Sequence, residues 1–356
     1  MALSIDIGSK HIKIVQGVPK KDGVTVTATF NAKIPNDISV GTPESQIAAI
    51  TGIIKPIFVK DKNRRRVADS ETKDVKIKKQ PCSITLSDDK FLIRNVVVPK
   101  GTVAEINGMA LQELIGTYSV NPLSVVESMT LNIQEDGKLL VRSAALDPEY
   151  ATGYYKLIQD IRQIPKSLNY HSNSIAKLMK SMPSINGTKT AGLNYMLMDC
   201  GMFSCILHVF HEGRPVQARY LPVGFSDLYY HLSRRNPLGE DADKAVVYTP
   251  NFLQTSSGYR NMPSVVTNHI ENFLNRLADE LAKYMRTLSL SIGSSGNIEN
   301  LFLFGGNAVL EGLPERLEEL LGFKVERVKT LFNVDMKPGC ENIIYHLNSI
   351  AALLNS

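Results

Sequence analysis

Two segments of the chain share one pattern of apolar and polar positions. Residues 3–17 read as an apolar run, the turn Asp6-x-Gly8 and a second apolar run, and residues 195–213 repeat this order around Asp199-x-Gly201. Short apolar runs bounded by turn residues predict buried strands. Each segment therefore predicts a strand–turn–strand unit, and the repeat, 193 residues apart from Asp6 to Asp199, indicates a duplicated lobe.

Three further patterns predict the remainder of the second half. Residues 300–307 read as an apolar strand that runs into Gly305-Gly306, followed by a helix with Leu317, Leu320 and Leu321 on one side. Apolar residues at helical spacing predict a long helix from Pro263 to about Leu290. The apolar segment Ile343–Leu354 lacks the Lys/Arg face of a helix that lies on a membrane, so we expect it to pack back onto a lobe.

A block with its own pattern separates the two Asp-x-Gly turns. It contains a helix that a capping box, Thr102-x-x-Glu105, opens. Around it we predict the strands Ser83–Leu86 and Phe91–Val98, a hairpin of Val125–Ile133 and Leu139–Ala145 over Asp136-Gly137, and a helix from Tyr150 to Ile164. These elements predict a small α+β module inserted in the first lobe.

Composition places the chain among soluble, intracellular proteins. Its 356 residues are enough for two domains, and 43% hydrophobic with 21% charged residues is an ordinary globular balance. The first residues lack the basic start and apolar run of a signal peptide. The most apolar window, 191–210, contains Asp199 and His208, so it predicts buried strands and not a membrane span. Four cysteines without a CxxC pair fit reduced thiols in the cytoplasm.

The net charge of +5 is concentrated in one segment. Lys60–Lys79 holds nine Lys or Arg against four Asp or Glu, which accounts for the whole excess. The plainer interpretation is a solvated loop. The alternative is a weak contact with an anionic membrane surface. No nucleic-acid partner is expected.

The Asp-x-Gly turns are suited to phosphate chemistry. A carboxylate of Asp6 or Asp199 holds Mg²⁺ through waters, because that ion keeps part of its hydration shell. Glycine lets the backbone bend close to an anion, and the N–H groups of the turn bind its oxygens. A single turn of this kind is ordinary. Two of them followed by a strand and Gly305-Gly306 are far more specific, while a P-loop motif is absent from the sequence.

The order of these motifs resembles the phosphate-1, phosphate-2 and adenosine motifs of the superfamily of actin, the heat-shock ATPases and sugar kinases. The resemblance implies ATP with Mg²⁺ as the cofactor. It implies a nucleotide site at Asp6, Gly8, Ser9, Lys13, Asp199, Gly201, Ser204, Glu280, Lys283, Gly305, Gly306 and Asn307. For Glu280 and Lys283, one helical turn apart, a surface ion pair is an equal alternative.

Within this superfamily the chain resembles the PilM family of type IV pilus assembly proteins. The similarity lies in Phe91–Pro99, the capped helix, Val120–Leu123 and the run from Gly213 to Gly224. It implies an α/β, actin-like fold with duplicated RNase H-like lobes and the module in the first lobe. It further implies an adaptor at the cytoplasmic face of the inner membrane, which binds the cytoplasmic tail of a bitopic, PilN-like membrane protein and links it to the pilus motor.

The chain departs from the family pattern after Gly201. Met202 and Phe203 follow this glycine, Ser204 stands where threonine is usual, and Lys283 stands where arginine is more typical. No acid that would orient an attacking water is evident, so we expect at most slow ATPase activity. Two alternatives stay open: a filament-forming cell-division protein similar to FtsA, and a small-molecule kinase of the same superfamily.

The predicted domains follow from this reading. We expect a first lobe of residues 1–35, 169–189 and 340–356, an inserted module of 36–168, and a second lobe of 190–339 with a smaller subdomain around 231–298.

Overall fold

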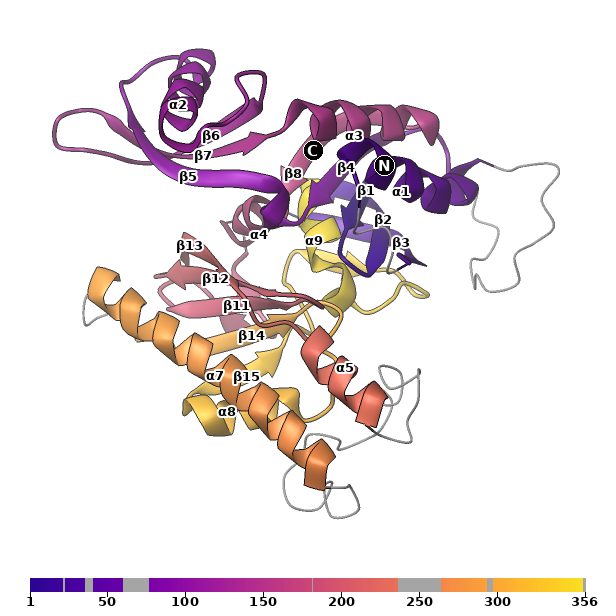
Figure 1. The fold of residues 1–356 in the computed structure, drawn as a ribbon, viewed down its shortest axis with the longest axis vertical. Helices are drawn as coiled ribbons and strands as arrows, with labels where there is room; N and C mark the ends of the chain where they lie inside the picture. The colour runs from indigo at the N-terminus through magenta and orange to yellow at the C-terminus, as the bar shows by residue number, and fades with distance from the viewer. Residues whose placement is uncertain are drawn as a thin grey trace. The chain divides into compact units, whose positions relative to one another are not determined.

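The computed structural model describes residues 1–21, 23–35, 41–59, 77–180, 182–235, 264–292 and 297–354 (Figure 1). In these ranges no helix combines the length and apolar character needed to cross a membrane.

Two sheets share one strand order. The first sheet has the order β16-β3-β2-β1-β4-β8, and the second has the order β13-β12-β11-β14-β15. Apart from β16, the strands of each sheet, numbered in chain order within that sheet, lie side by side in the order 3-2-1-4-5. This shared order confirms the predicted duplication. The strands of the first sheet are β1 (Ala2–Ile7), β2 (His11–Lys20), β3 (Gly23–Lys33), β4 (Pro81–Leu86), β8 (Ile164–Tyr170) and β16 (Val334–Met336). Those of the second are β11 (Tyr195–Cys200), β12 (Cys205–His211), β13 (Arg214–Leu221), β14 (Asn300–Phe304) and β15 (Lys324–Arg327).

The strand that carries the aspartate is central in each sheet. β1 pairs in parallel with β4, which pairs in parallel with β8. In the same way β11 pairs in parallel with β14, which pairs in parallel with β15. Every residue of β1, β11 and β14 is buried, as continuous apolar runs in parallel sheets predict.

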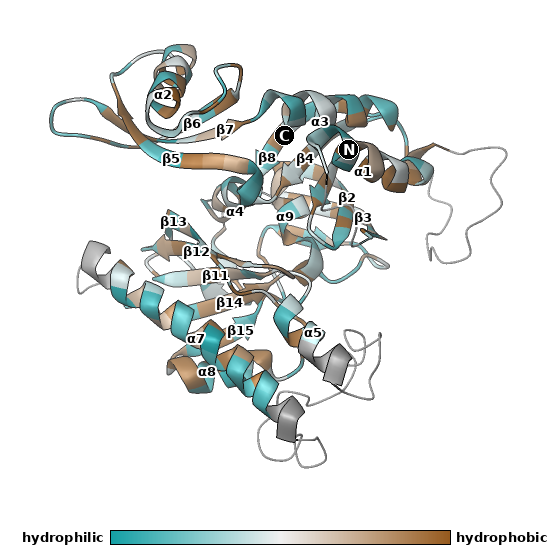
Figure 2. Ribbon diagram, in the orientation of Figure 1, coloured by the Kyte–Doolittle hydropathy of each residue, from teal (hydrophilic) through white to brown (hydrophobic). Residues whose placement is uncertain are grey.

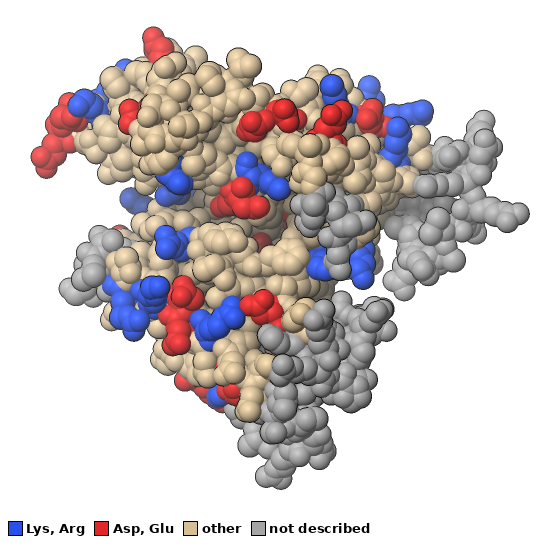
Figure 3. Space-filling model, in the orientation of Figure 1, with Lys and Arg blue, Asp and Glu red and all other residues tan. Residues whose placement is uncertain are grey.

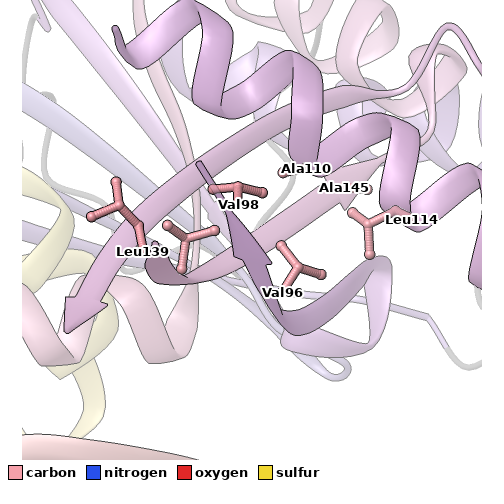
Figure 4. Close-up of a cluster of buried hydrophobic side chains, with 7 residues drawn as sticks. Val96, Val98, Ala110, Leu114, Leu139 and Ala145 are labelled. Atoms are coloured by element: carbon pink, nitrogen blue, oxygen red, sulfur yellow. The ribbon is translucent and has the colours of Figure 1, made fainter. Parts of the chain in front are cut away.

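The inserted module is a three-stranded sheet covered on one face by a helix. Its strands β5 (Phe91–Val98), β6 (Val125–Ile133) and β7 (Leu139–Leu146) have the order β5-β7-β6, and its helix is α2 (Val103–Tyr118). The capping box is present: Thr102 N donates to Glu105 Oε2 at 2.7 Å, and Glu105 N donates to Thr102 Oγ1 at 3.3 Å. The shared core is shown in Figure 4 and consists of Val96, Val98, Ala110, Leu114, Leu139, Val141 and Ala145.

The module is narrower than the range 36–168 predicted from the sequence. Strand β4 and the first part of β8 fall within that range, but β4 pairs with β1 and β8 pairs with β4 in the first sheet. The separate α+β body is therefore β5 to β7 with α2. Local patterns show where strands lie but not which strands pair, so the sequence alone does not separate β4 and β8 from the module.

Helices complete the two sheets. They are α1 (Pro43–Phe58), α3 (Pro148–Asp160), α4 (His171–Lys180), α5 (Ser226–Arg235), α7 (Ser264–Ile292), α8 (Leu313–Leu321) and α9 (Ile343–Leu354), with a 3-10 turn at Asp88–Lys90 and a short hairpin of β9 (Ser184–Ile185) and β10 (Thr188–Lys189). The long helix α7 is confirmed, and Figure 2 shows its hydrophilic side. Helix α3 ends at Asp160, four residues before the predicted Ile164, because Arg162 adopts the left-handed φ of 60° and β8 begins at Ile164.

The chain divides into two compact units. The first comprises residues 1–12 and 30–171, and the second comprises residues 13–29 and 172–355. Helix α9 packs back onto the protein, as expected, but it belongs to the second unit, whereas the sequence placed it in the first lobe. Ser349 Oγ donates to Lys13 O of β2 at 3.3 Å, and Gly305 N, at the end of β14, donates to Ile344 O at 2.9 Å. Predicted only as part of the first lobe, this helix thus contacts both β2 and the end of β14. The other domain boundaries stay a prediction.

Candidate functional site

The second Asp-x-Gly motif and the Gly305-Gly306 motif lie together at the carboxyl ends of two neighbouring strands of the second sheet. Asp199 lies at the carboxyl end of β11 and is in register with Phe304, the last residue of the neighbouring parallel strand β14. Gly305 and Gly306 follow directly. The carboxyl ends of neighbouring parallel strands are the common place for ligands in α/β sheets. Residues about 100 positions apart in the sequence are therefore brought together as the paired motifs predict.

Asp199 is held on both sides. Its Oδ2 accepts a hydrogen bond from Asn348 Nδ2 of α9 at 2.8 Å. Its Oδ1 lies against Gly305, where an added Cβ would come within 2.2 Å of that oxygen. Gly305 also has a φ of +96°, which side chains rarely adopt. Glycine is therefore required at 305 for two reasons: the backbone conformation, and the lack of room for a Cβ beside the carboxylate of Asp199.

Gly306 differs from its neighbour. A Cβ added there meets no atom within 4 Å among the described residues. The side chain of Asn307 points back into the protein: its Nδ2 donates to Cys200 O at 2.9 Å and its Oδ1 accepts from Tyr229 at 2.9 Å. Asn307, predicted as a ligand residue, thus fastens the end of β14 to β11. Open space remains over Gly306.

The turn after Asp199 is tight. A Cβ on Gly201 would come within 2.3 Å of Ser204 O, so glycine is needed there, and Ser204 is partly exposed beside it. Phe203, which departs from the family pattern, is 53% exposed.

The aspartate of the first predicted hairpin is buried and contacts a histidine. Asp6, at the end of β1, is 1% exposed and its Oδ1 lies 2.7 Å from Nε2 of the buried His171. His171 is the first residue of α4 and directly follows β8. Gly8 closes the turn, since its N donates to His11 O at 3.1 Å, and Ser9 is exposed. The predicted metal ligand Asp6 therefore already has a histidine partner.

The predicted pair on α7 is present as an ion pair. Lys283 Nζ lies 3.9 Å from Glu280 Oε1, with side chains 72% and 34% exposed. This is the surface pair that was the alternative interpretation, and an exposed pair of this kind contributes about 0–1 kcal/mol. Within the described part of the chain, no hydrogen bond joins either residue to the turns after β11 and β14.

Sequence reasoning missed His171 and Asn348, although the sequence carries a signal for both. The pattern His-x-Asn-Ser-Ile-Ala-x-Leu occurs at 171–178, in α4, and again at 346–353, in α9. The two copies are a second internal repeat, the helical counterpart of the Asp-x-Gly repeat. From α4 the histidine of the pattern reaches Asp6, and from α9 the asparagine reaches Asp199.

The second sheet fits a hydrated cation that accompanies a phosphate ligand. Oδ1 of Asn348 is buried beside Asp199 and has no hydrogen-bond partner among the described residues. No group of three His, Cys, Asp or Glu side chains suited to direct metal binding occurs in the described ranges. Mg²⁺ needs fewer protein ligands than such a group provides, because it keeps several waters and binds one or two carboxylates together with phosphates. Asp199, Asn348 and the space over Gly306 satisfy that requirement.

The cysteines and the basic segment add no chemistry to this site. Cys200 and Cys205 face each other across the β11–β12 hairpin and are fully buried, and burial raises the pKa of Cys205 to about 12. They behave as small buried hydrophobic residues. The basic segment Lys60–Lys79 lies outside the described residues except for positions 77–79.

Comparison with known proteins supports the fold. No family model and no curated protein matches the chain. A solved structure described as the "PilM-PilN type IV pilus biogenesis complex" matches 99% of this chain and 97% of its own, with a TM-score of 0.73 and 18% identity. Two weaker matches follow. The ethanolamine utilization protein EutJ from Carboxydothermus hydrogenoformans matches 99% of this chain and 89% of its own, at 13% identity and a TM-score of 0.48. A protein from Bacteroides thetaiotaomicron with an actin-like ATPase fold and unknown function matches 100% of this chain and 95% of its own, at 11% identity and a TM-score of 0.46.

The full-length match to the first of these structures and the repeated strand order confirm the predicted actin-like fold. They also confirm, at the level of fold, the resemblance to PilM.

Proposed function

We propose that this protein is an ATP-binding adaptor of type IV pilus assembly at the cytoplasmic face of the inner membrane. It would hold the cytoplasmic tail of a PilN-like membrane protein and link it to the pilus motor. The observation that carries the nucleotide part is the meeting of Asp199, Gly305 and Gly306 at the ends of two parallel strands. The partner is supported by the full-length structural likeness to a protein solved in complex with PilN.

In this proposal the second sheet holds the nucleotide. The open space over Gly306 admits the ligand to the backbone, and Asp199 faces the hydrated Mg²⁺ that accompanies the phosphates. Bound Mg²⁺ would neutralise phosphate charge. By virtue of the duplication, the first hairpin would offer the same kind of phosphate-binding turn at Gly8 and Ser9, and Lys13 stays a predicted phosphate contact.

The substitution Gly306→Val tests this site. Its side chain would project into the space over Gly306, so we expect ATP affinity, measured by calorimetric titration, to fall at least 100-fold, roughly 3 kcal/mol. Gly52→Val is the matched control, because Gly52 of α1 also faces open space but belongs to the first compact unit and to none of the predicted motifs. Wild-type affinity in Gly306→Val would remove the proposed site.

ATP turnover is expected to be slow, well below the roughly 10 s⁻¹ of a median enzyme. The two aspartates of the turns each already hold a nitrogen side chain, His171 or Asn348, and neither is placed as a free base. ATP would then act chiefly as a ligand that stabilises the folded state by mass action. Steady-state phosphate release near the median rate from pure protein would contradict this expectation.

The module is the proposed binding site for the tail. Strands β5 and β6 are the outer strands of its sheet, and an extended peptide that pairs with an outer strand satisfies its unpaired N–H and C=O groups. Apolar side chains are exposed along and before β6: Leu123 at 77%, Val125 at 56% and Ile133 at 61%.

The charge of the module suits such a tail. Residues 91–146 carry nine charged side chains, four Lys or Arg and five Asp or Glu, and Figure 3 shows few charges on this part of the surface. Cytoplasmic segments next to a membrane helix are enriched in Lys and Arg. A sparsely charged, mildly acidic surface with exposed apolar groups complements a tail of that composition.

A further inference from the structure

Asn348 is oriented by its neighbour. An ionised carboxylate only accepts hydrogen bonds, so the amide nitrogen of Asn348 must face Asp199 Oδ2, 2.8 Å away. The amide oxygen Oδ1 therefore points elsewhere. It is buried, in a residue that is 3% exposed, and it has no hydrogen-bond partner among the described residues. Buried carbonyl oxygens are almost always satisfied, which indicates that a donor other than the described residues completes this one.

The helix holds this side chain in a fixed place. Ile344 O, one turn before Asn348, accepts from Gly305 N, and Ser349, the next residue, donates to Lys13 O. Ile350 and Leu353 are fully buried. Asn348 and Ser349 thus join one turn of α9 to Asp199 and to the backbone of Lys13, two residues that the family resemblance places in the nucleotide site.

We infer that Asn348 is the positioning residue of a cation subsite beside Asp199. Its Nδ2 orients the carboxylate, and its Oδ1 accepts a hydrogen bond from a water of the Mg²⁺ that arrives with the nucleotide. A hydrated cation presents water hydrogens outward, so its second shell consists of acceptors such as carboxylate and amide oxygens. This inference rests on the proposed nucleotide site and assigns to it a residue that none of the three predicted motifs contains.

Two substitutions separate the donor from the acceptor. Asn348→Leu removes both groups at similar volume. ATP affinity in Mg²⁺ should fall about tenfold, as expected for the loss of a hydrogen bond at a charged group, whereas affinity in EDTA should stay as in the wild type. Asn348→Asp keeps the acceptor oxygen but sets a second carboxylate beside Asp199. Two buried carboxylates repel, so this variant should melt below the wild type in EDTA and gain more than the wild type from added Mg²⁺ and ATP.

Asn132→Asp is the matched control. Asn132 is an exposed residue of β6, so the substitution makes the same change in net charge far from Asp199 in the sequence and outside the second sheet. It should melt and bind Mg·ATP as the wild type does.

The proposed cation subsite is tested by calorimetric titration with ATP, in Mg²⁺ and in EDTA, and by thermal melting under the same conditions. An unchanged ratio of the two affinities in Asn348→Leu, or an Asn348→Asp variant whose melting responds to Mg²⁺ as the wild type does, overturns the cation subsite. If the leucine variant does not fold, the aspartate variant decides alone. If the wild type binds no ATP, both the proposed function and this inference are wrong. If the wild type binds Mg·ATP and Asn348→Leu binds it with the same affinity, only the inference is wrong.

Discussion

Replacement of Gly305 with alanine is expected to lower the free energy of unfolding by about 3 kcal/mol and to abolish ATP binding. A left-handed backbone costs a non-glycine residue roughly 1–2 kcal/mol, and forcing a methyl group into a packed site adds about 1–3 kcal/mol. The Cβ would come within 2.2 Å of Asp199 Oδ1. The carboxylate must therefore move away from Asn348, or the end of β14 must shift.

Gly306→Ala is the control for this prediction. Gly306 faces open space and does not have a positive φ. The alanine substitution should therefore change the free energy of unfolding by no more than about 0.5 kcal/mol. Urea denaturation followed by circular dichroism measures both variants. Equal stabilities of the two alanine variants would show that Gly305 is not constrained as the structure indicates.

Removal of the inserted module is expected to eliminate binding of the PilN-like tail while ATP binding persists. Phe91 of β5 and Leu146 of β7 are directly paired. A two-residue Asn-Gly turn can therefore replace residues 92–145, because such a turn joins paired antiparallel strands. Phe91 is kept because its ring packs 5.2 Å from that of Tyr170, and the first sheet keeps β4 and β8.

The measurement uses a tail peptide tethered to vesicles, with the full chain as the reference. The shortened protein should show no binding up to about 1 mM peptide, a loss of at least roughly 4 kcal/mol relative to a micromolar complex. Its ATP affinity, which serves as the folding control, should match that of the full chain. Undiminished tail binding by the shortened protein would place the partner site outside the module.

Local elements could be predicted closely from the sequence. Strand β5, hairpin β6–β7 and helix α9 have the predicted bounds or differ by one residue, because hydrophobic period, turn residues and caps act over a few neighbouring positions. The capping box at Thr102 is formed by the two residues that the pattern names. The duplication was also visible, since the two turns keep the Asp-x-Gly motif and its flanking apolar runs 193 residues apart.

The arrangement around the two aspartates was decided only by the tertiary structure. His171 reaches Asp6 from 165 positions away, and Asn348 reaches Asp199 from 149 positions away. The repeat that contains both residues stands in the sequence, but nothing local states that its histidine or its asparagine faces a carboxylate. The difference between Gly305 and Gly306 is of the same kind. Both belong to one dipeptide, and only the packing of β11, β14 and α9 leaves the first without room for a side chain and the second beside open space.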